Sequence, residues 1–166
     1  MPKKWIVNLT IGVSVAIAST PAALAQGVLT EQQISISSAQ EAAIAALDQC
    51  RKDGYRVSVT VVDRSGQTKV LMRDDGAAPH TPDTSRRKAY TALTFRTSTS
   101  ELASRVASNP SAANLKDITD VIILAGGLPI RAGNAVIGGI GVGGAPSGDQ
   151  DQVCAKAGVD KIINGN

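Results

Sequence analysis

The sequence predicts an α+β domain: a profilin-like antiparallel sheet flanked by helices. Two observations carry this prediction. Strand-type alternation and helical periodicity occur in separate stretches, and neighbouring strands are joined by short turns. In addition, no strand–helix–strand unit of the kind that builds a parallel sheet can be traced along the chain. The predicted order is α-β-β-α-α-β-β-α, which is typical of helices packed on an antiparallel sheet.

The first elements are a helix and a β-hairpin. Residues 37–51 are alanine-rich with an apolar stripe, and Ser38 with Glu41 has the form of a capping box. Residues 55–63 alternate β-branched and polar side chains, which predicts a strand. A short turn then leads into an antiparallel partner strand over residues 68–73.

A loop and two helices follow. The loop contains glycine and two prolines, and a helix over residues 84–95 follows it, capped by Asp83 or Thr84. A shorter helix over residues 100–107 is expected to stop at the Asn-Pro pair at 109–110.

The last elements are two strands and a helix. Strands are predicted over residues 121–124 and 135–142, around a turn-rich segment at 125–134. The final helix is predicted over residues 147–163, where Ser147 and the glutamine three residues later form a capping box.

The last strand is unusually rich in glycine. Glycine weakens a strand unless another group approaches its backbone closely. Two explanations stay open: tight packing of a helix or a second subunit, and a flat ligand lying against bare backbone. The glycines are Gly138, Gly139, Gly141, Gly143 and Gly144.

The N-terminus has the pattern of a secretory signal peptide. Lys3 and Lys4 precede an apolar stretch, and Ala23-Leu24-Ala25 is a small-x-small cleavage signature. The alternative is a retained membrane anchor, for which the apolar stretch is short. We therefore expect cleavage after residue 25, a single domain over residues 26–166, and a periplasmic or secreted protein.

Composition restricts the partners of this domain. Lys and Arg number 17 against 14 Asp and Glu, and two of the lysines leave with the signal peptide. The balanced charge argues against nucleic acid, and against a polybasic membrane-binding patch after signal cleavage. The chain has only one Trp, two Tyr and one Phe, so its small side chains bury little area each. Burial at subunit interfaces would compensate, and we expect a homo-oligomer.

Cys50 and Cys154 are the only two cysteines. Export would place them in an oxidising compartment, where a structural disulfide is expected. Such a bridge needs the first and last helices to be neighbours and would close a loop of roughly 100 residues. The alternative is thiolate ligation of a metal or haem, although the chain has no Cys-x-x-Cys motif.

The loop and helix start near His80 form the candidate site. His80 is the single histidine of the chain, and it lies beside the hydroxyls of Thr81 and Thr84. A neutral imidazole is a good iron ligand near pH 7. The alternative is that His80 merely caps the helix or is solvated.

Three consecutive cations, Arg86, Arg87 and Lys88, fan around the same helix and cannot all reach one place. Arg87 or Lys88 could pair with a ligand carboxylate such as a haem propionate; the alternative is a solvated helix face. Tyr90 and Met72 are weaker ligand candidates, because a helix interior and a strand usually bury such side chains.

Six motifs, in this order over most of the chain, resemble the GlcG/HbpS family, including its exported haem-binding members and the C-terminal domain of PduO-type proteins. The resemblance implies a profilin-like α+β fold, homo-oligomeric assembly and, for several members, haem binding. It does not indicate which residue would meet iron, because axial ligands differ between members. The motifs are VVDRSG at 61–66, DGA at 75–77, HTPDTSRRKAYTA at 80–92, GGLPI at 126–130, GGIGVGG at 138–144 and DQD at 149–151.

Three functions therefore compete at this stage. The first is an exported haem-binding protein for sequestration, storage or sensing. The second is an enzyme or accessory protein acting on a small metabolite of the glycolate or hydroxy-acid type. The third is an oligomeric interaction module. Hydrolase and metal-enzyme patterns such as Gly-x-Ser-x-Gly and His-Glu-x-x-His are missing from the sequence, which argues against those enzyme classes. The second function still keeps enzymatic activity as an open alternative.

Overall fold

The computed structural model describes Met1, Gly27 and residues 29–164. Residues 31–166 form one compact unit, and the following description concerns that unit. The predicted signal peptide lies outside the described residues, apart from Met1. None of the helices between residues 29 and 164 combines the length and the apolar character that a membrane span needs.

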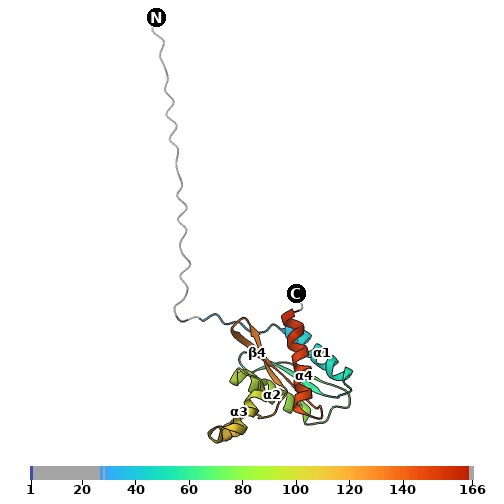
Figure 1. Cartoon of the computed structure of the whole chain (residues 1–166). Coiled ribbons are helices and arrows are strands. Elements are labelled where there is room, and N and C mark those ends of the chain that lie inside the picture. The colour runs from blue at the N-terminus through green and yellow to red at the C-terminus, as the bar shows by residue number, and fades with distance from the viewer. Residues whose placement is uncertain (2–26, 28, 165–166) are drawn as a thin grey trace. The chain divides into compact units, whose positions relative to one another are not determined.

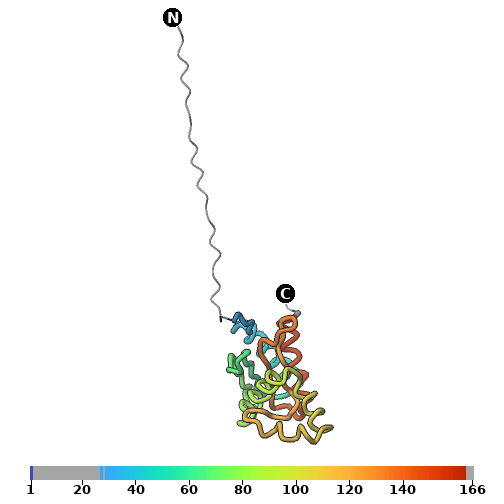
Figure 2. The backbone as a smooth tube through the Cα atoms, turned by 90° about the vertical axis from the view of Figure 1, so that its left-hand side faces the viewer, coloured from blue at the N-terminus to red at the C-terminus, as the bar shows by residue number. Residues whose placement is uncertain are grey.

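A four-stranded antiparallel sheet in the order β2-β1-β4-β3 forms the middle of the domain, which confirms the predicted α+β class (Figure 1). Figure 2 shows α3 and η1, coloured yellow to light orange, at the end of the domain away from the last turn of α4. The elements are α1 (Ile36–Lys52), β1 (Ser58–Asp63), β2 (Thr68–Arg73), α2 (Thr81–Phe95), α3 (Thr99–Ser108), the 3₁₀ helix η1 (Pro110–Asp117), β3 (Gly127–Ala132), β4 (Ala135–Gly143) and α4 (Gly148–Asn164).

One face of the sheet carries the apolar core beneath α1 and α4, which lie side by side (Figure 1). Val59 and Val61 of β1 and Ile140 of β4 are fully buried there. The two helices can approach closely because their contact residues are small. A Cβ added to Gly158 would lie 2.5 Å from the carbonyl oxygen of Ala42.

The other face of the sheet is covered by α2 and is lined by hydroxyls and glycines. The hydroxyls of Ser58 and Thr81 lie 2.8 Å apart, and those of Thr60 and Ser85 lie 2.7 Å apart, all fully buried. These pairs satisfy polar groups that would otherwise be costly to bury.

The glycines of β4 allow α2 to lie directly on the sheet backbone. A Cβ on Gly141 would come within 2.1 Å of the Ser85 carbonyl oxygen, and one on Gly139 within 2.4 Å of the Ala89 carbonyl oxygen. Tight helix packing is therefore the correct explanation of Gly139 and Gly141, whereas a Cβ on Gly138 or Gly144 would meet the Val62 or Arg56 carbonyl oxygen. The alternative, a flat ligand against the backbone, is wrong at Gly139 and Gly141, because α2 occupies the space there.

The prediction of a strand over residues 121–124 is wrong. That segment is irregular, and β3 lies within the stretch expected to be turns. Gly127 and Pro129 suggested turns, yet β3 is an edge strand, where proline is tolerated. Gly127 is required by packing, because a Cβ there would lie 2.3 Å from the carbonyl oxygen of Lys88. The helix η1 was not predicted at all.

Two of the predicted helix caps are wrong and one is confirmed. Ser35, not Ser38, caps α1. The helix α2 begins at Thr81, which makes His80 its N-cap residue in place of Asp83 or Thr84. The capping box before α4 is present, since Ser147 and Gln150 each accept a hydrogen bond from the other's backbone N–H.

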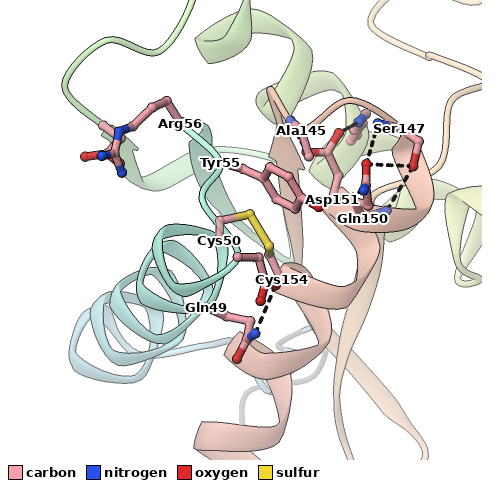
Figure 3. The surroundings of a disulfide bond; sticks show 12 residues. Gln49, Cys50, Tyr55, Arg56, Ala145, Ser147, Gln150, Asp151 and Cys154 are labelled. Atoms are coloured by element: carbon pink, nitrogen blue, oxygen red, sulfur yellow. Dashed lines mark hydrogen bonds and ion pairs between the residues drawn. A yellow bond between two sulfur atoms is a disulfide. The ribbon is translucent and has the colours of Figure 1, made fainter.

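Cys50 and Cys154 form the predicted disulfide between α1 and α4 (Figure 3). Their Cα atoms lie 5.4 Å apart and both residues are fully buried. The alternative role as thiolate ligands is therefore wrong for this structure.

Candidate functional site

A cavity of about 330 Å³ lies where the start of α2 meets the loop between β4 and α4. Both polar and apolar groups line it. The lining residues are Ala78, His80, Thr81, Thr84, Lys88, Leu124, Gly144, Ala145, Pro146, Ser147, Gly148 and Asp151.

His80 lies at the rim of this cavity and is exposed to solvent. Although it is the N-cap residue of α2, its side chain caps nothing, and its imidazole makes no hydrogen bond to the described residues. Its carbonyl oxygen accepts the backbone N–H and the hydroxyl of Thr84. The backbone of His80 is thus fixed by the helix, whereas both imidazole nitrogens can take an external partner.

The two threonines of the predicted site already have partners within the fold. Thr81 is fully buried and donates its hydroxyl hydrogen bond to the Ala78 carbonyl oxygen, 2.8 Å away, in addition to its contact with Ser58. The Thr84 hydroxyl is 3.1 Å from the His80 carbonyl oxygen. They shape the cavity wall and hold the backbone at the start of α2.

Lys88 lines the cavity but is buried, so it is not an exposed cation. Its side chain is 1% exposed, and its Nζ lies 2.6 Å from Oδ2 of Asp151, whose side chain is 4% exposed. The other carboxylate oxygen, Oδ1, accepts the backbone N–H of Ala145 at 2.9 Å (Figure 3). The charge of Lys88 is therefore already compensated inside the protein.

Burial perturbs both partners of this pair. It lowers the pKa of the Lys88 ammonium and raises the pKa of the Asp151 carboxyl, because both charged forms lose hydration. Their mutual attraction opposes these shifts without cancelling them. The free-energy difference between the ionised pair and the neutral pair is therefore smaller than in water.

Two of the predicted site residues lie away from the cavity. The Nη2 atom of Arg87 donates to the Val121 carbonyl oxygen at 2.6 Å. Tyr90 is ten residues beyond His80, about 15 Å along the helix axis. It lines a separate cavity of about 280 Å³ with Arg64 and Arg96. The structure thus brings together His80, Thr81, Thr84 and Lys88, but not Arg87 and Tyr90.

Two residues of interest, Asp151 and Arg73, were not predicted from the sequence as part of the candidate site. Asp151 had the ordinary appearance of a first-turn helix charge, and its 63-residue separation from Lys88 gives no local signal. Arg73 donates from Nε and Nη2 to the carbonyl oxygen of Ala77, at 3.1 Å and 2.5 Å, and Ala77 directly precedes Ala78 of the cavity wall. Among the described residues, no three or more His, Cys, Asp or Glu side chains gather as a possible metal site.

Comparison with known proteins gives consistent matches. Residues 34–160 match the family HbpS-like, described as haem degrading protein HbpS-like. A crystal structure of a double mutant of Streptomyces reticuli HbpS is 45% identical, with a TM-score of 0.78, covering 87% of this chain and 97% of that chain. A crystal structure described as a PduOC:heme complex is 26% identical, with a TM-score of 0.69, covering 76% and 93%. An uncharacterized 15.0 kDa protein of the dhaT-dhaS intergenic region of Citrobacter freundii is 32% identical over 129 residues, covering 76% of this chain and 90% of the relative.

Proposed function

Since the chain belongs to the HbpS-like family, we propose that it binds haem, and that the imidazole of His80 would hold the iron. The observation that carries this proposal is the exposed imidazole of His80, which has no hydrogen-bond partner among the described residues although its backbone is held by α2. An imidazole on a fixed backbone needs little reorganisation to bind iron, which favours affinity. The related PduOC:heme complex supports haem as the ligand class.

The residues around His80 can contact the edge of a tetrapyrrole ring. Leu124 is 44% exposed and lines the cavity together with Pro146 and Ala78, so an apolar surface is available to a macrocycle. When bound, haem would supply an iron centre for ligand binding or redox chemistry. The protein would contribute the imidazole nitrogen and this apolar wall.

Arg73 replaces Lys88 as the preferred partner of a propionate. The guanidinium of Arg73 contacts only a carbonyl oxygen and no carboxylate among the described residues, so its charge is available. Lys88 is paired with Asp151. Arg87 also contacts only a carbonyl oxygen, but that oxygen belongs to Val121, away from the cavity, whereas Arg73 contacts Ala77, next to Ala78 of the cavity wall. A charge-assisted hydrogen bond from Arg73 would contribute about 1.5–3 kcal/mol where it is shielded from water.

The proposal includes export and self-association. A disulfide suits a periplasmic or secreted protein better than a cytosolic one. His80 and Leu124 are exposed at the cavity of about 330 Å³, so a second copy of the chain in a homo-oligomer would cover the outer side of a bound planar ligand. Haem sequestration, storage or sensing is the role consistent with such a site.

Titration of the purified oxidised protein with hemin, followed by Soret absorption, tests this function. We expect saturable binding with one hemin per site in the wild type and in Tyr90→Phe, the matched control in the other cavity. His80→Ala should weaken binding and shift the Soret band, and Arg73→Ala should weaken it without shifting the band. Absence of saturable binding in the wild type would refute the proposal.

A further inference from the structure

We propose that Lys88 is a reactive amine, which forms an imine with a small aldehyde entering the cavity, while Asp151 carries the protons. This activity goes beyond haem binding and does not depend on it. It rests on the cavity, on the buried pair and on the chemistry of the two groups.

The first observation is that a buried ammonium has only one acceptor. A lysine ammonium offers three N–H donors, and among the described residues only Asp151 Oδ2 accepts from Lys88. Burying two charges with so few partners costs several kcal/mol per ion, and apolar residues of the same volume often give equal stability. Stability alone therefore does not account for an ion pair at this position, and perturbed titratable groups beside a cavity are typical of functional sites.

The second observation is that the cavity reaches both groups. Lys88 and Asp151 form part of its wall although both are almost completely buried. Gly126 allows the backbone to lie directly against the pair: a Cβ there would lie 2.8 Å from Lys88 Nζ and 2.7 Å from Asp151 Cβ, so any side chain at this position would displace the two groups. Its φ of +118° also favours glycine. A cavity of about 330 Å³ is within the range of small-ligand sites.

The third observation is that Asp151 is held in an orientation suited to proton transfer. The Ala145 N–H fixes Oδ1, so that Oδ2 is the oxygen next to Lys88 Nζ. Burial lowers the pKa of Lys88 and raises that of Asp151, and both shifts favour the neutral pair. In the neutral pair the proton lies on Asp151 and the amine carries a lone pair.

The reaction balances without any oxidant or reductant. The lone pair of Nζ forms a C–N bond to the aldehyde carbon, the C=O π pair moves to oxygen, and that oxygen takes the proton of Asp151. The carboxylate then removes a proton from nitrogen, which leaves a carbinolamine. Protonation of its hydroxyl by Asp151 releases water as the C=N bond forms, and the remaining nitrogen proton returns to Asp151. The other titratable group on the cavity wall, His80, takes no part in these transfers.

Reductive trapping on the wild-type protein tests the proposal with internal controls. The oxidised protein is treated with acetaldehyde and sodium cyanoborohydride at neutral pH, and the ethylated lysines are identified by peptide mass spectrometry over time. Lys52, Lys116 and Lys161 are exposed and report ordinary amine reactivity. We expect Lys88 to be labelled at least about ten times faster than these three, although it is the most buried of the four. Labelling of the exposed lysines with none at Lys88 would overturn the proposal.

Two variants separate reactivity from folding and from haem binding. Asp151→Asn should slow labelling of Lys88 while the exposed lysines are labelled at the wild-type rate. If this variant does not fold, the rates in the wild type still decide the question. Tyr90→Phe, in the other cavity, should keep the labelling of Lys88. Hemin titration and reductive labelling are measured on separate samples of the wild type, so a failure of hemin binding and a failure of imine formation are observed independently.

Discussion

Lys88 Nζ lies 2.6 Å from Asp151 Oδ2, and this ion pair joins two helices that cover opposite faces of the sheet. Cys154 lies one turn after Asp151 in α4, and its disulfide bond to Cys50 joins α4 to α1 (Figure 3). The start of α4 is therefore held from both layers, by an ion pair to α2 and by a covalent bond to α1. This double attachment fixes the loop before α4 that forms one wall of the cavity.

Lys88→Met should destabilise the fold by about 3–5 kcal/mol, because it leaves the Asp151 carboxylate buried without a counter-ion. Urea unfolding of the oxidised protein measures the loss. The matched control is Lys156→Met, which breaks an exposed pair with Asp160 and should cost less than about 1 kcal/mol. Equal effects of the two substitutions would contradict the importance assigned to the buried pair.

Loss of the disulfide should lower stability substantially. The bridge closes a loop with a sequence separation of 104 residues. The chain-entropy argument gives about 4.7 kcal/mol for a loop near 100 residues, and native bridges typically contribute about 2–5 kcal/mol. Thermal unfolding of a Cys50→Ala, Cys154→Ala double variant should show a clearly lower Tm than the wild type. An unchanged Tm would mean that α1 and α4 pack equally well without the bridge.

Gly141→Ala should be far more damaging than Gly143→Ala on the same strand. A Cβ at residue 141 would lie 2.1 Å from the Ser85 carbonyl oxygen, which is backbone and cannot move without shifting α2. At residue 143 the nearest atom is the Thr84 side-chain methyl, at 3.2 Å. We expect a loss of about 3 kcal/mol or more for the first and about 1 kcal/mol for the second, by chemical denaturation. The reverse order would show that α2 does not pack as described.

Stability should fall in acid through Asp74. The hydrogen bond from Arg51 lowers the pKa of the buried Asp74 carboxyl below its ordinary value of 3.8. A carboxyl with a lowered folded-state pKa contributes stability above the unfolded-state pKa and loses it as the pH falls through the folded-state pKa. Asp74→Asn should therefore reduce the pH dependence of unfolding below about pH 4, in comparison with Asp48→Asn, an exposed partner of the same arginine. Parallel pH curves for wild type and Asp74→Asn would contradict this role.

Much of the fold could be predicted from local sequence pattern. The alternation in 55–63 and the periodicity in 37–51 are local signals, and both elements are present with shifts of a few residues at their ends. The disulfide could be predicted because the chain has only two cysteines. The strand β3 could not, because Gly127 serves packing against α2 and Pro129 is tolerated only because β3 lies at an edge. Both observations depend on tertiary packing, which the local sequence does not show.

The candidate site was only partly predictable for the same reason. His80, Thr81 and Thr84 are close in sequence, so their proximity in space followed from the helix start. Lys88 was expected to face a ligand at the surface, but its helix face turns toward Asp151, which lies far away in sequence. Burial of a charge depends on which segments meet, and local periodicity does not contain that information.

The most direct test of the proposed function uses the fact that the chain has one histidine. Untagged protein labelled only with ¹⁵N-histidine carries the label at His80 alone. Pulsed electron paramagnetic resonance of its ferric hemin complex, compared with the unlabelled complex, reports whether that nitrogen is bound to iron. We predict a ¹⁵N hyperfine coupling of an axial imidazole in the labelled sample. Identical spectra from the labelled and unlabelled complexes would contradict axial ligation by His80.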